Sequence, residues 1–178
     1  MSHIEYEVRI LEINKEEIQG KLNELNAVLV EDVLQKRYVY DFKPAIPQKW
    51  IRLRTNGNKT TLTIKNIEST KIDGTKETEI EVSDFDTTNE ILRELGYEPR
   101  GIQENKRIKY NLNGVEVDID TWPKIPTYLE IEGSSETEVY NTLEQLGIPK
   151  EKATSLDVQS IYKEIYGIDL DKEPNLAF

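Results

Sequence analysis

The strongest constraint on the fold is a two-residue alternation of charged and apolar side chains. In residues 4–13, IEYEVRILEI, three charged side chains share one strand face: Glu5, Glu7 and Arg9. Ile4 and Val8 fall on the opposite face. A helix would scatter these residues around its axis, so the period predicts β-strands with one apolar and one ionic face.

The same alternation recurs in most later strand candidates, and the sign of the charge changes from strand to strand. The ionic faces carry Arg52 and Arg54; Thr61, Thr63 and Lys65; Glu77, Glu79 and Glu81; Arg107 and Lys109; Glu116, Asp118 and Asp120; and Glu130 and Glu132. Any one such strand is ordinary for an antiparallel sheet with one face in water. If the set closes into a barrel with helices outside, the ionic faces line its interior.

Turn signals separate the strands and favour antiparallel neighbours. Asn56-Gly57 and Asn113-Gly114 each lie between two extended segments, which is a strong hairpin signal. About eight mainly antiparallel strands with a few helices predict an α+β domain whose sheet curls toward a barrel. We expect one domain over residues 1–178.

Four helices are expected between and after the strands. The expected helices begin at caps Asn14, Thr87 and Ser135, and a fourth covers Asp157–Tyr166. The second would use Ile91, Leu92 and Leu95 as its core face. The tail over 168–178 is expected to be loosely structured.

Composition excludes several classes of function. With 34 acidic and 23 basic residues the formal charge is -11, which argues against a general nucleic-acid or anionic-membrane binder. No cysteine is present, so disulfides, thiolate zinc sites and a cysteine nucleophile are excluded. No leader-like segment or membrane-spanning apolar stretch is evident, so we expect a cytoplasmic protein.

A barrel interior lined with charged side chains needs charged ligands, because buried charges must be paired or bind ions. Carboxylates at positions i and i+2 on one strand face lie about 7 Å apart and suit hard divalent cations. Arginines at the same spacing present planar forks that fit phosphate oxygens. The pattern therefore predicts a divalent metal together with a chain of phosphates.

The order of these segments resembles the CYTH superfamily, also called triphosphate tunnel metalloenzymes. Glu5-Tyr6-Glu7-Val8-Arg9 is similar to the family signature Glu-x-Glu-x-Lys. Further resembling blocks are RYVYDF (37–42), WIRLR (50–54), TLTIK (61–65), ETEIEV (77–82), KRIKY (106–110), VDIDTWPKIPTYLEIEG (117–133) and SIYKEIYG (160–167). The resemblance covers nearly the whole chain and implies an eight-stranded antiparallel barrel forming a tunnel with a polar, charged interior and flanking helices.

The resemblance also assigns expected site residues. Those expected to hold Mg²⁺ or Mn²⁺ are Glu5, Glu7, Asp120, Glu130 and Glu132. Those expected to bind the triphosphate are Arg9, Arg52, Arg54, Lys65 and Arg107. Secondary candidates are Glu79, Lys106, Lys109, Tyr38 and Tyr40. The family is also compatible with a homodimer.

Two positions depart from the family pattern. Arg9 stands where the family usually has lysine; it keeps the charge but stays protonated and cannot accept a proton. Asn105 stands two residues before Arg107, where family members often have a base, which would remove one phosphate contact.

Three functions remain open from the sequence. Water attacking the terminal phosphorus would make the chain a metal-dependent hydrolase of tripolyphosphate or an organic triphosphate, which we favour because no adenine pocket is evident. A ribose hydroxyl attacking the α-phosphorus would instead make it a class IV adenylate cyclase that forms cyclic AMP and pyrophosphate. The third alternative is a polyphosphate-binding module without catalysis.

Overall fold

The computed structural model describes residues 3–178 and consists of a long sheet with helices at its two ends. Its strands are β1 His3–Ile10, β2 Val28–Asp41, β3 Lys49–Thr55, β4 Thr60–Ile67, β5 Thr75–Val82, β6 Pro99–Leu112, β7 Val115–Thr121, β8 Tyr128–Gly133 and β9 Ala153–Thr154. Its helices are α1 Lys15–Glu24, α2 Phe85–Glu94, α3 Glu136–Gln145 and the short α4 Val158–Ser160.

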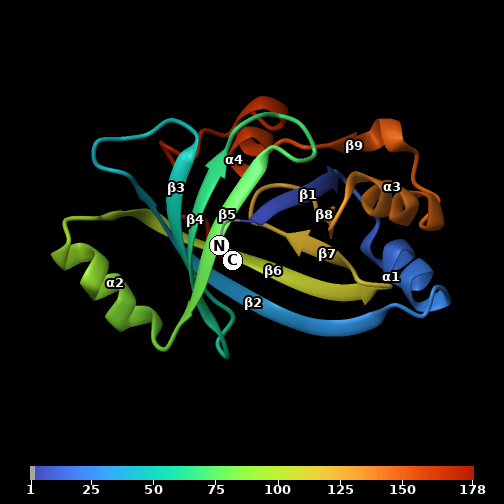
Figure 1. The fold of residues 1–178 in the computed structure, drawn as a ribbon, viewed down its shortest axis with the longest axis horizontal. Helices are drawn as coiled ribbons and strands as arrows, with labels where there is room; N and C mark the ends of the chain where they lie inside the picture. The colour runs from blue at the N-terminus through green and yellow to red at the C-terminus, as the bar shows by residue number, and fades with distance from the viewer. Residues whose placement is uncertain (1–2) are drawn as a thin grey trace.

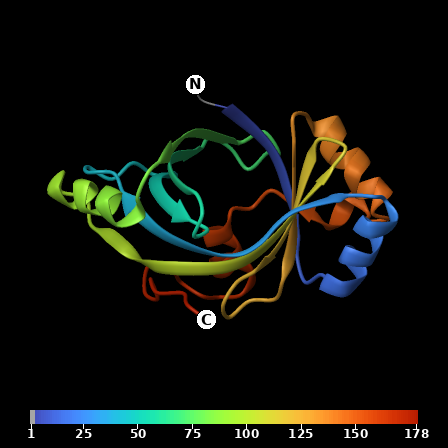
Figure 2. The same cartoon turned by 90° about the horizontal axis from the view of Figure 1, so that it is seen from below.

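The sheet closes on itself. Its strand order is β5-β4-β3-β2-β6-β7-β8-β1-β9, and β1 also pairs with β5, so that β1 to β8 form a ring. Every pairing between these strands is antiparallel, and Figure 2 shows the strands curving round into this ring. The predicted eight-stranded antiparallel barrel and its α+β class are confirmed.

The predicted turns fall where the sequence places them. Asn113 and Gly114 join β6 to β7 with φ angles of 56° and 96°, as a two-residue type I′ hairpin requires. Gly57 has a φ of 89° in the loop between β3 and β4. Each turn makes sequential strands antiparallel neighbours, which fixes their register and therefore the face on which each charge lies.

The outside of the barrel is covered at one end by α1 and α3. Ile18 of α1 and Leu143 of α3 are buried in a core with Val117 and Ile131 of the sheet. Asn14 caps α1 by accepting a hydrogen bond from the Glu17 amide, as predicted. This core contains the apolar strand faces, so the ionic faces are left for the interior.

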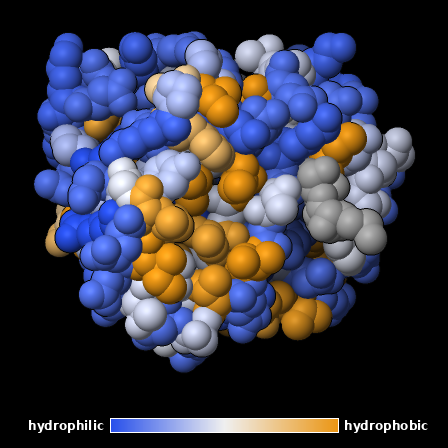
Figure 3. All heavy atoms as spheres, turned by 60° about the vertical axis from the view of Figure 1, so that its left-hand side comes forward, coloured by the Kyte–Doolittle hydropathy of each residue, from blue (hydrophilic) through white to orange (hydrophobic). Residues whose placement is uncertain are grey.

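The helix α2 covers the opposite end and differs from expectation. It begins after Asp84, whose carboxylate accepts a hydrogen bond from the Thr87 amide, so Thr87 is not the cap. Phe85 and Leu92 are buried against β2 and β3, whereas Ile91 and Leu95 are 54% and 69% exposed. The expected core face is confirmed at Leu92 and wrong at Ile91 and Leu95, because the helix packs on the sheet along the Phe85–Leu92 line. Figure 3, which brings this side forward, shows apolar side chains gathered at the surface.

The C-terminal segment is packed against the barrel. The helix expected over Asp157–Tyr166 is present as the short α4, capped by Asp157, and a π-helical turn that continues it over Ile161–Ile165. Leu176 is 1% exposed, and its backbone exchanges hydrogen bonds with Ile102 and Glu104 of β6. Gly101 allows this contact, because a Cβ at this position would collide with the backbone of Pro174. The expectation of a loosely structured tail does not hold at Leu176.

Truncating Leu176 tests this packing. We expect Leu176→Ala to lower the free energy of unfolding by about 2–5 kcal/mol, because it removes a buried side chain and leaves a cavity. Leu95→Ala, at an exposed position, should change it by about 0.5 kcal/mol or less. Urea denaturation followed by circular dichroism measures both variants. Equal stabilities of the two variants would mean that the tail does not pack in solution.

Candidate functional site

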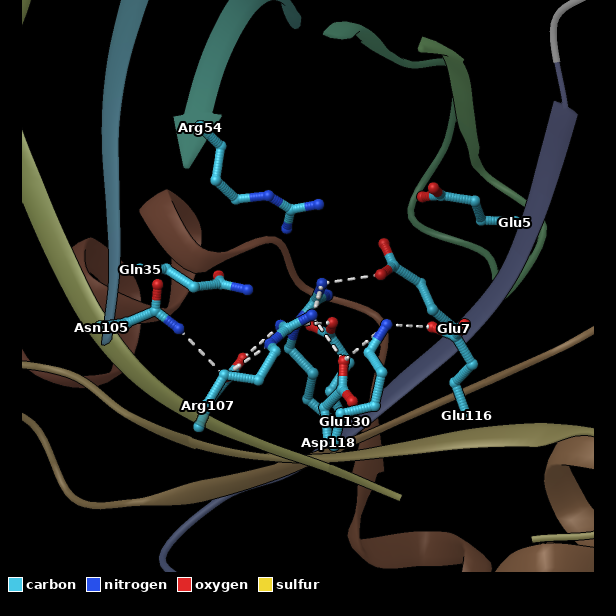
Figure 4. Close-up of polar contacts among 12 residues, drawn as sticks. Glu5, Glu7, Gln35, Arg54, Asn105, Arg107, Glu116, Asp118 and Glu130 are labelled. Carbon is cyan, nitrogen blue, oxygen red and sulfur yellow. Dashed lines mark hydrogen bonds and ion pairs between the residues drawn. The ribbon is translucent and has the colours of Figure 1, made fainter. Parts of the chain in front are cut away.

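The ionic strand faces meet inside the barrel. In the antiparallel register Arg9 lies opposite Glu130, Glu130 opposite Asp118, and Asp118 opposite Lys109. A cavity of about 490 Å³ occupies the interior, which we call the lumen. In Figure 4 Arg54 and Glu5 project into it from opposite sides. The predicted side chains that line it are Glu5, Glu7, Arg9, Arg52, Arg54, Lys65, Glu79, Arg107, Lys109, Glu130 and Glu132.

Three of the secondary candidates point away from the lumen. Tyr40 is fully buried outside the barrel, where its hydroxyl donates to Asn89 of α2, and the Tyr38 ring lies 5.2 Å from that of Phe85. Lys106 lies on the outer face with its ammonium 4.6 Å from the ring of Phe178. A two-residue period shows which residues of a strand share a face, but not which face points into the barrel. Tyr38 and Tyr40 share the face of β2 that points away from the lumen.

One wall of the lumen is rich in carboxylates, and we call Glu5, Glu7, Glu116 and Glu132 the acidic cluster. Glu132 lies between Glu7 and Glu116 in the strand register, and within residues 3–178 it forms no ion pair. Burial, and then repulsion from Glu5 and other carboxylates, raises the pKa of Glu132 to about 8. Burial raises the pKa of Glu5 as well, and its Oε2 has no hydrogen-bond partner.

Next to the acidic cluster, two arginines are neutralised by carboxylates. Arg9 is 3% exposed and lies 2.8 Å from Glu7 and 2.7 Å from Glu130, and it donates to the carbonyl oxygen of Leu156 at 2.9 Å. Although burial opposes it, Arg9 and then Arg107 hold the pKa of Glu130 well below its usual range. These ion pairs order the middle of the lumen.

Arg107 is the second neutralised arginine. It contacts Asp118 at 2.5 Å, Asp120 at 2.5 Å and Glu130 at 3.0 Å. Asp120 is completely buried, and it also accepts a hydrogen bond from Asn105 at 3.0 Å. Asp120 is thus enclosed by Arg107 and Asn105 and lies behind the lumen surface.

The opposite wall is basic, and we call Arg37, Arg52 and Arg54 the cationic wall. Arg37 of β2 lies directly opposite Arg54 of β3 in the register. Repulsion from Arg52, followed by burial and Arg107, lowers the pKa of Arg54 to about 9. Arg52 is 3.3 Å from Glu77, and the nearest acid to Arg54 is Glu79 at 3.8 Å. The basic charge on this wall is only partly compensated.

The strand β5 provides the remaining partners of the bases. Glu77 lies 2.5 Å from Lys65, which is also 3.4 Å from Glu5. Glu79 accepts a hydrogen bond from Thr63 at 2.6 Å and lies 3.5 Å from Arg52. These contacts support a role for Glu79 in pairing with a base.

The sequence interpretation missed Arg37 and Gln35 of β2. Their strand mixes apolar and polar residues on its inward face, where Val33 and Val39 share the parity of Arg37. The signal that could have identified them is the strand register, because β2 lies between two strands whose inward faces are basic. Gln35 and Asn105 lie side by side in Figure 4, as their pairing requires.

A divalent cation fits the acidic cluster by its chemistry. In the described part of the chain no three carboxylates converge on a ready-made metal site, because Glu7 and Glu130 are engaged by Arg9. However, Glu5 Oε2 is buried without a hydrogen-bond partner, and the carboxylates around Glu132 repel one another. A hard cation with oxygen ligands would satisfy both features.

The raised pKa values predict how stability depends on pH without metal. A carboxyl whose pKa is higher in the folded than in the unfolded state favours folding at low pH, and this contribution is lost as pH rises toward the folded pKa. Glu132, with a pKa of about 8, and Asp118, about 7, both fall in this class. We therefore expect the Tm in EDTA to fall between pH 6 and pH 8.5.

Glu132→Gln isolates this effect. The variant should have a higher Tm than the wild type at pH 8.5 and a smaller fall across the same range, because it removes one titrating group and its repulsion from Glu5. Differential scanning calorimetry in EDTA measures both. A wild-type Tm that rises with pH over this range would contradict the charge arrangement of the lumen.

The chain is thus an antiparallel barrel with a charged lumen, in which a cationic wall faces an acidic cluster. The model of the CYTH domain matches residues 3–161, and the chain therefore belongs to the CYTH domain family. No curated protein matched the chain by sequence. No helix in residues 3–178 has the length and apolar character needed to cross a membrane.

Solved structures share this fold. The PH1012 protein from Pyrococcus horikoshii is 24% identical, with a TM-score of 0.75, over 86% of this chain and 96% of that one. A candidate adenylate cyclase from Vibrio parahaemolyticus is 14% identical, with a TM-score of 0.75, over 94% and 99% of the two chains. HpAC1 from Hippeastrum, a candidate adenylyl cyclase with a dominant triphosphatase activity, is 17% identical, with a TM-score of 0.59, over 94% and 97%.

Proposed function

We propose that this protein is a divalent-metal-dependent phosphohydrolase that acts on a triphosphate, either inorganic tripolyphosphate or an organic triphosphate. The observation that carries the proposal is the division of one lumen into a cationic wall and an acidic cluster. Such a lumen matches a polyanion with its accompanying cation, because each wall then meets a charge of opposite sign.

The bases of the lumen have separate roles in this proposal. Arg52, Arg54 and Lys65 project from adjacent strands, and they would donate hydrogen bonds to successive phosphate oxygens. Arg107 would bind phosphate while Asp118 and Asp120 hold its guanidinium in place. Arg9 would contact phosphate only alongside its existing bonds to Glu7 and Glu130, so we assign it chiefly to positioning these carboxylates.

The cation would be held by Glu5, Glu7 and Glu132, with Glu130 beside them. Asp120, which the family resemblance places among the ligands, is assigned instead to positioning Arg107, because its oxygens are already engaged and its side chain is completely buried. When bound there, Mg²⁺ or Mn²⁺ would neutralise charge on the phosphate oxygens and polarise them toward displacement at phosphorus.

The lining of the lumen favours hydrolysis over cyclisation. Besides Tyr128, its apolar side chains in residues 3–178 are Val30, Trp122 and Val158, so the lining offers little apolar surface on which a purine base could stack. The charged side chains of the lumen therefore suit the binding of a phosphate chain and do not require a base-binding site. The dominant triphosphatase activity of HpAC1, which shares the fold, is consistent with this choice. Adenylate cyclase activity is the alternative function.

One assay separates the functions. The purified protein with Mg²⁺ or Mn²⁺ is offered tripolyphosphate, ATP and thiamine triphosphate in separate reactions. Orthophosphate, pyrophosphate and cyclic AMP are then quantified. We expect orthophosphate release that stops in EDTA and resumes when the metal is restored. Pyrophosphate with cyclic AMP would establish the cyclase instead, and binding without turnover under either metal would leave a polyphosphate-binding module.

A further inference from the structure

Arg37 is buried in the cationic wall with only neutral partners. Its side chain reaches the amide oxygens of Gln35, at 3.1 Å, and Asn105. It is 7% exposed, and its Nε has no hydrogen-bond partner. Among residues 3–178 no carboxylate lies within 4.0 Å of its guanidinium. Within the described residues Arg37 therefore occupies the interior without an ion-pair partner, and Asp120, which attracts it from farther away, is already paired with Arg107.

The other bases at the centre of the lumen differ in this respect. Arg9 lies against two carboxylates, Arg107 against three, and Lys65 against two. The side chain opposite Arg37 in the register is the basic Arg54. Arg37 thus differs from these bases in having, in the described part of the chain, no carboxylate in direct contact.

Burying a charge without an ion-pair partner is costly. Burial, and then repulsion from Arg52 and Arg54, lowers the pKa of Arg37, yet a guanidinium keeps its proton at neutral pH. The ring of Trp122, 4.5 Å from the guanidinium carbon, offers a cation-π contact but no negative charge. A buried charge of this kind requires an anion to balance it.

We infer that Arg37 binds a phosphate oxygen of the triphosphate. It lies beside Asn105, which has no positive charge of its own, and would supply the base at that place in the lumen. The inference rests on the proposed function and adds a residue to its site. Arg37 lines the main lumen and also a smaller adjoining cavity of about 90 Å³ that is covered by Asp157 and Leu170 of the C-terminal segment. Its guanidinium is therefore available from the lumen while its amide partners hold it in place.

Two variants of Arg37 and one control test this inference. Arg37→Gln removes the charge, and Arg37→Lys keeps it without the planar fork. The matched control is Arg93→Gln, which removes one positive charge from an exposed side chain on α2 that pairs with Glu98 at 3.5 Å. The probe is the hydrolysis-resistant imido analogue of tripolyphosphate with Mg²⁺, and calorimetric titration measures its Kd.

We expect Arg37→Gln to raise the Kd of this analogue by about 10- to 100-fold, as the loss of a charge-assisted hydrogen bond implies. Arg37→Lys should give an intermediate Kd, and Arg93→Gln should bind within about twofold of the wild type. Without the analogue, the Tm of Arg37→Gln should equal or exceed that of the wild type, because an unbalanced charge has been removed. A purely structural arginine would lower this Tm without changing the Kd.

The possible failures are distinguishable. If the wild type binds the analogue and Arg37→Gln binds it equally well, the role of Arg37 is wrong and the proposed function stands. A fall in ligand-free Tm with an unchanged Kd has the same meaning. If the wild type does not bind the analogue, both the proposed function and the role of Arg37 are overturned.

Discussion

Glu5→Gln is expected to lower kcat for triphosphate hydrolysis by about 10³-fold, because it removes one negative charge from the proposed cation site. The substitution keeps the size of the side chain. The only basic group within ion-pair distance of Glu5 in residues 3–178 is Lys65, at 3.4 Å, so the fold should persist. Orthophosphate release at saturating substrate and Mn²⁺ measures the loss, and circular dichroism checks the fold.

The matched control is Glu81→Gln. Glu81 lies on the same parity of β5 as Glu77 and Glu79, but its side chain is 67% exposed and pairs with Lys59 at 3.3 Å. It should retain kcat within about twofold, since an exposed pair contributes little. Full activity in Glu5→Gln would remove Glu5 from the metal site.

Arg9→Ala is expected to lower the free energy of unfolding by about 3–5 kcal/mol, because it leaves Glu7 and Glu130 as buried charges without their shared partner. It also removes the bond from Arg9 to the Leu156 carbonyl, which ties the C-terminal segment to β1. Arg9→Lys should cost less, since it keeps the charge but cannot bridge all three groups. Urea denaturation measures each variant.

A double-mutant cycle separates this ion pair from simple loss of packing. Adding Glu130→Gln to Arg9→Ala should destabilise the protein less than the sum of the two single substitutions, because the second change removes a charge left unpaired by the first. Additive effects, or an Arg9→Ala variant as stable as the wild type, would show that Arg9 does not link these carboxylates.

Much of the fold and of the site could be predicted from the strand alternation, because the face on which a strand residue lies depends only on its position in the local sequence. Glu5, Arg54 and Glu130 come from three separate strands, and each lies in the lumen where its parity places it. Once Asn113-Gly114 and the other turns set sequential strands antiparallel, the charged faces had to converge if the sheet closed. Closure itself depends on the contact of β1 with β5, which no local pattern encodes.

The parts that could not be predicted depend on contacts between distant segments. Arg37 was missed because its strand shows no clean alternation, and its contact with neutral side chains rather than a carboxylate is visible only beside Gln35 and Asn105. The enclosure of Asp120 depends on Arg107 from the neighbouring strand. The tail over residues 168–178 was expected to be loosely structured, yet Leu176 is buried against β6.

An anomalous diffraction experiment on crystals grown with Mn²⁺ and the imido analogue of tripolyphosphate tests most directly whether the lumen holds both the metal and the phosphates. We expect a manganese peak beside Glu5, Glu7 and Glu132, with the phosphates extending from it toward Arg52 and Arg54 in the same lumen. Manganese and analogue bound only outside the barrel, or an empty lumen at concentrations that saturate binding in solution, would contradict this expectation.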